Sequence, residues 1–290
     1  MKAENKKILL AYLELTKPRI LTLVLITTTL GFFLSGDGIT SLSQLLILLV
    51  GAAFVCAGSS TLNHYLEREA DSKMFRTCHR PIPSGIISPS RALSFGIVLV
   101  LSGVLILCWG INLLTAFLSL LSAFLYVLVY TPLKKISWVN TSIGAIAGAL
   151  PPMGGWAAAS GELTLGAWVL FFILFLWQHP HFYAIAWMFK DDYKRAGFKM
   201  LPVVYPDGIS TFQQINLCSL LLIPISLLPT YLGISGWLYF YGSLFLGIGL
   251  FGIGRKLSFS KSMRDAQHLL HASVIYLPVL LFFIIIDRIV

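Results

Sequence analysis

The sequence predicts an all-α, polytopic membrane protein with nine transmembrane helices and a cytoplasmic N-terminus. Of its 290 residues, 57% are hydrophobic and only 11% are charged, whereas soluble domains carry roughly 25% charged residues. Apolar runs recur along the chain, and each is close to the roughly 20 residues with which a helix crosses a bilayer. Lysine and arginine gather at alternate connections between these runs. Together these observations exclude a soluble fold and favour one multi-span membrane domain.

The predicted elements begin with a basic and polar N-terminal segment, residues 1–17, which we expect on the cytoplasmic side. No short apolar stretch with a small-residue cleavage site precedes the first span, so we expect no removable signal peptide. Residues 18–290 then form the single membrane domain. Glycine, serine and charged residues separate its helices, as turns between helices require. The nine predicted spans cover residues 18–35, 43–62, 93–110, 113–131, 139–158, 165–188, 213–233, 237–254 and 268–287.

The basic residues set the predicted orientation. Twenty of the 21 lysines and arginines lie in the N-terminal segment and in the connections after the second, fourth, sixth and eighth helices, and Arg288 falls on the other side. By the positive-inside rule the basic face is cytoplasmic, so we expect a multi-pass protein of the bacterial cytoplasmic (inner) membrane. This topology accounts for the formal charge of +9 without nucleic acid, which we do not expect as a partner. Basic residues beside the spans also favour anionic membrane lipid.

The first acidic segment, residues 63–71, closes the second predicted helix. Asn63, Glu67 and Asp71 recur at four-residue steps, so on a continuing helix their side chains form one stripe, about 5–6 Å apart. Such oxygen ligands suit Mg²⁺, which one or two carboxylates hold together with phosphate oxygens of a substrate. Arg76 and Arg80 follow, and arginine forms forked contacts with phosphate. The segment predicts a Mg²⁺ and diphosphate site; the alternative is a solvated helix end whose acids pair with adjacent basic residues.

The second acidic segment, residues 190–203, closes the sixth predicted helix. Asp191 and Asp192 precede Lys194 and Lys199, so acids again come before basic residues. Asp71 and Asp191 lie 120 positions apart and follow even-numbered helices on one face, which suggests a parallel internal repeat. If the two segments meet across the repeat axis, both would hold Mg²⁺ on one diphosphate.

Two more lysines on this face are candidates for diphosphate binding. Lys17 precedes Pro18, and Lys134 follows Pro132. Both positions are at the end of a predicted span, where a cation can meet a phosphate group. Interfacial anchoring of a helix end is the alternative for each lysine.

These motifs resemble those of the UbiA-type intramembrane prenyltransferases, and the resemblance extends over nearly the whole chain. The family's first motif is an asparagine followed at four-residue steps by two acids, usually both aspartate. It falls on Asn63, Glu67 and Asp71, so Glu67 departs from the commoner residue. The second, Asp-rich motif of the family falls on Asp191 and Asp192.

Other runs resemble the branch of the family that modifies haem. Many members of the family carry a second acid four residues after the first in their second motif, whereas this chain has Arg195 there. The runs typical of the haem-modifying branch are residues 76–85, 148–152, 177–182 and 191–203.

The resemblance implies a ring of helices around a central cavity, with the acidic segments at its cytoplasmic end. It implies a Mg²⁺-dependent transferase that moves a farnesyl group from farnesyl diphosphate to a vinyl group of haem b, giving haem O. The implied catalytic and metal-binding residues are Asn63, Glu67, Asp71, Asp191 and Asp192. His179 and His181 are candidate haem contacts, with hydrogen bonding between helices as the alternative. Contact with a downstream haem-modifying enzyme or terminal oxidase is a further expectation.

Other functions stay open from the residues alone. Prenyl transfer to another aromatic or tetrapyrrole acceptor would use the same acidic motifs. A secondary transporter would place ionisable residues near mid-membrane, whereas here the spans are almost free of charge and the acids lie at one rim. A lipid phosphotransferase would need an Asp-Gly opening and a three-aspartate spacing that the sequence lacks.

Overall fold

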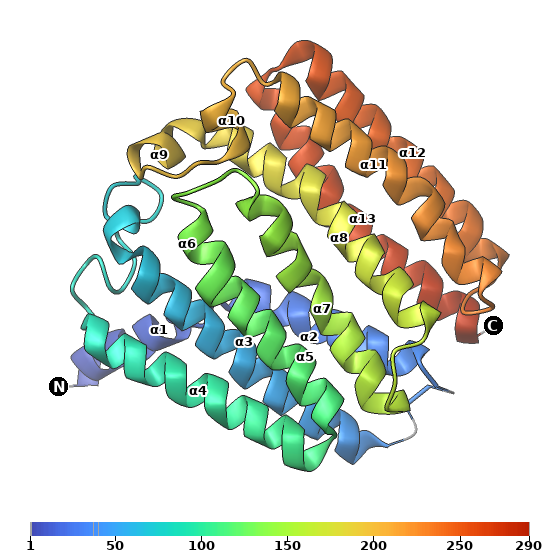
Figure 1. Cartoon of the computed structure of the whole chain (residues 1–290), viewed down its shortest axis with the longest axis horizontal. Helices are drawn as coiled ribbons and strands as arrows, with labels where there is room; N and C mark the ends of the chain where they lie inside the picture. The colour runs from blue at the N-terminus through green and yellow to red at the C-terminus, as the bar shows by residue number, and fades with distance from the viewer. Residues whose placement is uncertain (1, 37, 40, 290) are drawn as a thin grey trace.

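The structure is a computed structural model that describes residues 2–36, 38, 39 and 41–289, without the side chains of residues 2–4, 288 and 289. Arg288, predicted on the far face, therefore lies outside the described side chains. All regular structure in the described chain is helical. The long helices run side by side along a shared direction (Figure 1). The all-α prediction is confirmed.

The helices follow one another without long irregular stretches except between α3 and α4. The first half holds α1 (Lys2–Leu15), α2 (Pro18–Leu34), α3 (Leu42–Asp71), α4 (Pro89–Gly110), α5 (Leu113–Phe124), the π-helix η1 (Leu125–Tyr130) and α6 (Thr131–Leu133). The second half holds α7 (Asn140–Ser160), α8 (Leu165–Met188), α9 (Lys190–Arg195), α10 (Leu201–Val204), α11 (Ile209–Tyr231), α12 (Trp237–Ser260) and α13 (Met263–Ile289). Each predicted span corresponds to one helical segment, although α3 continues nine residues beyond the predicted end at residue 62, and α12 extends six residues beyond residue 254. The N-terminal segment is itself helical, as α1.

Seven helical segments of the described chain are long and apolar enough to cross a membrane. They are α3, α4, the continuous run from α5 through α6, α8, α11, α12 and α13. Helix α2 is apolar but has only 17 residues, and α7, with 21 residues, is rich in glycine and contains Pro151 and Pro152. Nine crossings and the cytoplasmic N-terminus therefore stay predictions.

Helices α2 and α7 approach each other closely because glycine faces the partner backbone on both. A Cβ atom added to Gly31 of α2 would collide with the carbonyl oxygen of Pro152, and one added to Gly155 of α7 would collide with that of Thr28. Small residues permit such contact between membrane helices, where burial of apolar surface provides little drive for association. The pair forms a tight wall on one side of the cavity described next.

The helices of the C-terminal part are packed together by large side chains, whereas the helices of the N-terminal part leave a cavity between them. Trp177, Tyr239 and Tyr276 are buried among α8, α11, α12 and α13. A cavity of about 310 Å³ instead lies between α2, α3, the α5–η1 run, α7 and α8. None of the described residues of α11, α12 or α13 lines it. The cavity is thus lined mainly by α2, α3, the α5–η1 run, α7 and α8, with Tyr193 of α9 and Phe198 at one end.

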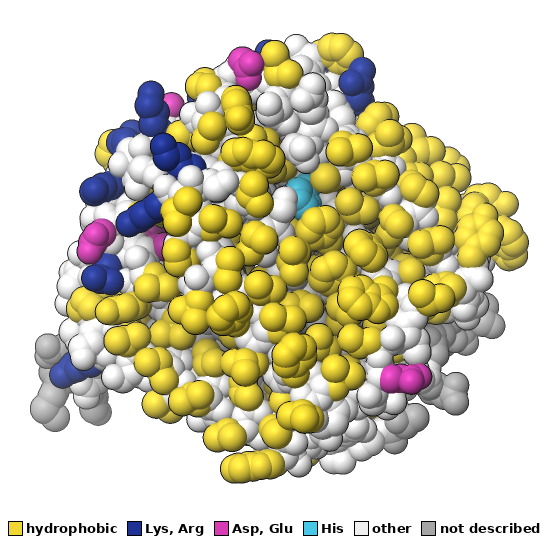
Figure 2. Space-filling view, viewed as in Figure 1, with side chains coloured by type: hydrophobic (Ala, Val, Ile, Leu, Met, Phe, Trp, Pro, Cys, Tyr) yellow, Lys and Arg dark blue, Asp and Glu magenta, His cyan; other side chains and the backbone are white. Residues whose placement is uncertain are grey.

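The surface separates into an apolar belt and a charged end. Figure 2 shows hydrophobic side chains over most of the visible face, with lysine and arginine gathered at the end that carries α9 and α10 in Figure 1. Exposed apolar side chains such as Leu101, Phe245 and Phe282 contribute to the belt. This distribution suits helices that are surrounded by lipid along their length and by water and headgroups at one end.

Candidate active site

The cavity is polar at one end and apolar along the rest of its length. Its lining along α3 changes from Leu48 and Ala52 to Asn63, Glu67 and Asp71. The interval from Leu48 to Asp71 corresponds to roughly 35 Å of helix at 1.5 Å per residue. We call the end formed by Asn63, Glu67 and Asp71, together with the lining cations Lys17, Arg80 and Lys134, the polar end. A long apolar chain with a charged head matches this arrangement.

The acidic stripe forms because α3 continues without interruption to Asp71. The side chains of Asn63, Glu67 and Asp71 all line the cavity, as their four-residue spacing predicted. The residues are only 1%, 5% and 0% exposed, respectively. Buried carboxylates require partners, since an unpaired charge in a low-dielectric interior is costly.

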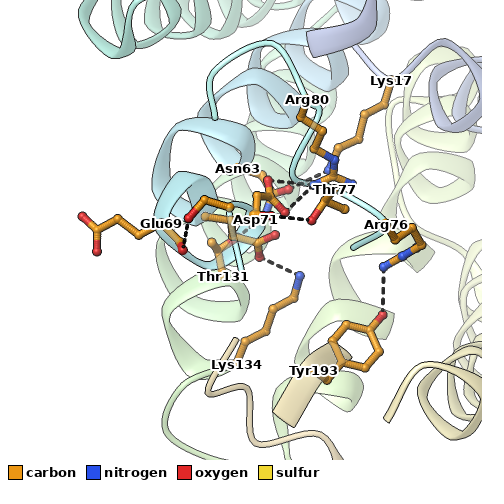
Figure 3. Close-up of polar contacts among 12 residues, drawn as sticks. Lys17, Asn63, Glu69, Asp71, Arg76, Thr77, Arg80, Thr131, Lys134 and Tyr193 are labelled. Carbon is orange, nitrogen blue, oxygen red and sulfur yellow. Dashed lines mark hydrogen bonds and ion pairs between the residues drawn. The ribbon is translucent and has the colours of Figure 1, made fainter. Parts of the chain in front are cut away.

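The partners of the stripe come from distant parts of the chain (Figure 3). Arg80 donates to both carboxylate oxygens of Asp71, at 2.8 and 2.9 Å. Lys134 Nζ lies 2.6 Å from Glu67 Oε1, and Lys17 Nζ donates to Asn63 Oδ1 at 2.6 Å. The adjacent Arg68 pairs with Glu69 instead. Glu67 and Asp71 are therefore neutralised by cations that converge on the cavity.

Local backbone features bring these cations to the polar end. Lys17 has a left-handed backbone, with φ of 51°, at the junction of α1 and α2. Lys134 follows α6, the short turn that continues η1; η1 is a π-helix, a rare element that is often found at functional sites. Its Nζ lies 4.5 Å from the ring centroid of Tyr130. Arg80 lies in the connection after α3, which Thr77 ties down by donating to the carbonyl oxygen of Asp71 at 3.0 Å.

The two lysines differ in how their surroundings act on the charge. Burial lowers the pKa of Lys17 to about 7; the carboxylate of Glu67 opposes this shift, and the cations of Arg80 and Lys134 add to it. Burial also acts to lower the pKa of Lys134, but the carboxylate of Glu67 and the neighbouring tyrosines outweigh it and hold the pKa above its usual value. Lys134 is thus the firmly charged member of the pair.

The acidic and basic side chains of the second segment lie beside the cavity without lining it, whereas Tyr193 and Phe198 of the same segment do line it. Asp191 is exposed, and Asp192 forms an ion pair with Arg195. Lys194 and Lys199 are exposed and do not line the cavity either. The backbone amide of Lys199 donates to the carbonyl oxygen of Lys134 at 2.6 Å, so this segment supports the polar end through its backbone. Among the described residues, no group of three or more His, Cys, Asp or Glu side chains forms a ready metal cluster.

The two histidines of α8 make interhelical hydrogen bonds. His179 Nε2 lies 3.1 Å from Ser142 Oγ of α7, and His181 Nδ1 lies 2.9 Å from Ser273 Oγ of α13. Neither side chain lines the cavity. This placement is the alternative that the sequence left open for both residues.

The cavity also contains residues that the sequence did not single out. Tyr126, Tyr130, Gln178, Phe182 and Tyr193 line it. Tyr126 Oη accepts a hydrogen bond from Lys17 at 3.2 Å, and the rings of Tyr126 and Tyr130 stack at 5.5 Å. The available signal was the spacing of Tyr126, Tyr130 and Lys134, which repeats the four-residue step of the acidic stripe.

Comparison with known proteins places the chain among prenyltransferases. A model described as the UbiA prenyltransferase family matches residues 24–282. A Solibacter usitatus protein named Protoheme IX farnesyltransferase is 45% identical over 286 residues, covering 96% of this chain and 98% of the relative. Proteins of the same name from Salinibacter ruber and Aquifex aeolicus are 42% and 38% identical, each covering at least 95% of this chain and 97% of the relative.

Solved structures share the fold at lower sequence identity. A digeranylgeranylglyceryl phosphate synthase superposes with a TM-score of 0.82 at 21% identity, covering 97% of this chain and 99% of the other. A UbiA homologue from Archaeoglobus fulgidus bound to GPP and Mg²⁺ gives a TM-score of 0.66 at 17% identity, covering 94% and 99%. These structures show that the helical arrangement is shared.

Proposed function

The chain belongs to the UbiA prenyltransferase family, and we propose that it transfers a farnesyl group from farnesyl diphosphate to a vinyl group of haem b, forming haem O. The observation that carries this proposal is the 45% identity, over nearly the full length of both chains, to a relative named Protoheme IX farnesyltransferase. The cavity supports it, because a charged end and a long apolar lining suit an isoprenoid diphosphate. The enzyme is a transferase that works within a membrane.

We propose the polar end as the diphosphate site. Arg76, Arg80 and Lys134 line the cavity with two carboxylates, Glu67 and Asp71, so the cavity has an excess of positive charge for an anionic ligand even though burial lowers the pKa of Lys17 to about 7. Arginine and lysine both bind phosphate oxygens, arginine through a fork of two N–H groups. As the allylic carbon–oxygen bond breaks, negative charge grows on the diphosphate, and these donors would stabilise it more strongly than in the ground state.

The oxygen atoms of the polar end fit Mg²⁺. Glu67 and Asp71 supply two carboxylates and Asn63 an amide oxygen on one buried stripe. Mg²⁺ is usually held by one or two carboxylates together with substrate phosphates and water, so a larger protein cluster is not needed. We propose that these three residues would hold Mg²⁺; when bound, it would neutralise charge on the leaving diphosphate. The pairs Arg80–Asp71 and Lys134–Glu67 would then open, so that the cations turn to the diphosphate.

The apolar part of the cavity would protect the reacting carbon. Its walls exclude water around the allylic cation until the acceptor is in place. The terminal vinyl carbon of haem b then forms a bond to the farnesyl carbon, and water adds to the other vinyl carbon with loss of a proton. The product carries a hydroxyethylfarnesyl group, and diphosphate leaves. No covalent bond to the protein is formed at any step.

We propose a lesser role for the second acidic segment. Asp192 is paired with Arg195, whose guanidinium carbon lies 4.1 Å from the ring centroid of Phe75 in the connection that carries Arg80. Asp192, Lys194 and Lys199 would thus act from the rim of the diphosphate site. Asp191 points to solvent and would contribute least. His179 and His181 stay candidates for haem contact only if the helices around them separate.

We also propose the location of the polar end and its partners. The basic residues at that end favour the cytoplasmic side of a bacterial inner membrane by the positive-inside rule. Anionic lipid would bind the same surface. Delivery of haem O by direct contact with a downstream haem-modifying enzyme or terminal oxidase is a further prediction.

One assay tests the proposed reaction. Purified protein is incubated with Mg²⁺, farnesyl diphosphate and haem b, and the pigment is analysed by mass spectrometry. We expect the mass of haem O, its loss on addition of EDTA, and its return with excess Mg²⁺. Farnesylation of a phenolic acceptor without haem O would overturn the acceptor. Absence of any farnesylated product would overturn the proposed function.

A further inference from the structure

A second, smaller chamber of about 150 Å³ adjoins the cavity. Four residues line both spaces: Arg76, Tyr130, Phe182 and Tyr193. The rest of its wall consists of Thr141 from α7, Ile185 from α8 and Met200 from the segment before α10. The chamber is thus mainly apolar and aromatic, and among its lining residues Arg76 alone carries a formal charge.

Arg76 differs from Arg80 and Lys134 because no carboxylate of the described chain forms an ion pair with it. Arg80 and Lys134 each form an ion pair with an acid of the first segment. Arg76 instead lies 4.9 Å from the ring centroid of Phe189 and donates to Tyr193 Oη at 3.4 Å. Figure 3 shows its side chain directed to Tyr193, apart from the contacts around Asp71. Aromatic groups therefore orient a guanidinium whose charge is not neutralised.

An exposed, unpaired arginine at the edge of an apolar chamber suits a ligand that is both aromatic and anionic. Guanidinium matches a carboxylate as well as a phosphate in its forked geometry. The diphosphate already has Lys17, Arg80 and Lys134 at the polar end. The acceptor in the proposed function, haem b, carries two propionate carboxylates on one edge of a flat apolar macrocycle.

We propose that Arg76 binds a propionate carboxylate of the acceptor, and that the chamber formed by Thr141, Ile185 and Met200 receives the edge that bears it. The inference rests on the proposed function and assigns Arg76 to the acceptor, whereas the sequence had placed it on the diphosphate. The propionates and the vinyl groups lie on different edges of the macrocycle. Anchoring a propionate at Arg76 would therefore direct a vinyl edge into the main cavity, where the allylic carbon lies.

The test is to measure both substrates separately in Arg76→Gln. We expect the KM for haem b to rise about tenfold, the loss typical of a charge-assisted hydrogen bond, with the KM for farnesyl diphosphate changed less than about twofold. The wild type should show the same weakening with haem b dimethyl ester, and Arg76→Gln should show no further loss with that ester. Arg91→Gln is the matched control, because Arg91 is an exposed arginine outside both cavities.

A second variant tests the chamber itself. Ile185 lines the small chamber and not the main cavity, so Ile185→Trp should fill it and weaken haem binding while leaving the KM for farnesyl diphosphate unchanged. A raised KM for farnesyl diphosphate with normal haem binding in Arg76→Gln would overturn the inference. It would also be overturned if Arg76→Gln raised the KM for haem b and the KM for its dimethyl ester by the same factor. Absorbance titration of haem b without farnesyl diphosphate measures the affinity of the wild type and of Arg76→Gln for haem b when no transfer can occur. A failure of this inference can therefore be distinguished from a failure of the proposed function.

Discussion

The two acidic segments share a pattern, in which acidic residues precede basic ones, but they have different structures. The first ends α3, which runs unbroken for 30 residues to Asp71, and its stripe faces the cavity. The second follows α8, which ends at Met188; Phe189 departs from helical geometry, with φ of −113° and ψ of 26°, and α9 has only six residues. The break redirects the chain, so Asp191 becomes exposed and Asp192 pairs with Arg195. Helix continuity, more than composition, decides which acids reach the cavity.

The comparison predicts a graded loss of activity from the first segment to the second. Asp71→Asn should have the largest effect, about 10³-fold in the rate of haem O formation, because it removes the buried carboxylate that we propose as a Mg²⁺ ligand and that pairs with Arg80. The rate is measured with saturating substrates, and size-exclusion chromatography in detergent checks that the variant is folded. A rate close to wild type would contradict the metal-binding role of Asp71.

Glu67→Gln should follow, with a loss of about 10²-fold. The substitution keeps the shape of the side chain but removes the charge that pairs with Lys134 at 2.6 Å. Glu67→Asp is the matched control, because it restores the carboxylate that the family more commonly carries. We expect Glu67→Asp to recover most of the lost activity, and two equally inactive variants would show that the charge is not the cause.

Lys134→Met should raise the KM for farnesyl diphosphate by about tenfold, since it removes a firmly charged donor from the polar end. Lys135, its neighbour, is exposed and does not line the cavity. Lys135→Met should therefore leave both KM values unchanged. If the two variants behave alike, the effect of Lys134 is one of overall charge on this face.

Asp192→Asn should reduce the rate by roughly fivefold, because it frees Arg195 from a pair that braces the rim of the site. Asp191→Asn should change it by less than about twofold, since exposed charges contribute little. Initial rates of both variants under one set of conditions check the order. A greater loss for Asp191→Asn than for Asp192→Asn would reverse the assignment within the segment.

The sequence predicted the helices and the first acidic segment because both depend on local rules. Apolar run length located the helices, and a four-residue spacing placed Asn63, Glu67 and Asp71 on one stripe. The break at Phe189 has no comparable signal, since neither proline nor glycine lies there. The predicted sixth span ended at residue 188, where α8 ends, but composition does not show the direction that the chain takes after Phe189, and so it did not show that Asp191 is exposed.

The partners of the acids were harder to predict because they are distant in sequence. Lys134 reaches Glu67 from 67 residues away, and Lys17 reaches Asn63 from 46. Both lysines were candidates, but spacing cannot show which basic residue pairs with which acid. The position of the cavity also depends on how Trp177, Tyr239 and Tyr276 pack between α8, α11, α12 and α13. Such packing cannot be inferred from residue spacing.

The most direct test of the difference between the two segments is equilibrium binding of farnesyl thiodiphosphate, an analogue with a poor leaving group, in the presence of Mg²⁺. Its affinity is measured for the wild type, Asp71→Asn and Asp191→Asn. We predict that Asp71→Asn weakens binding by about 10²-fold and Asp191→Asn by less than about twofold. Equal weakening in both variants, or a greater loss in Asp191→Asn, would contradict the account.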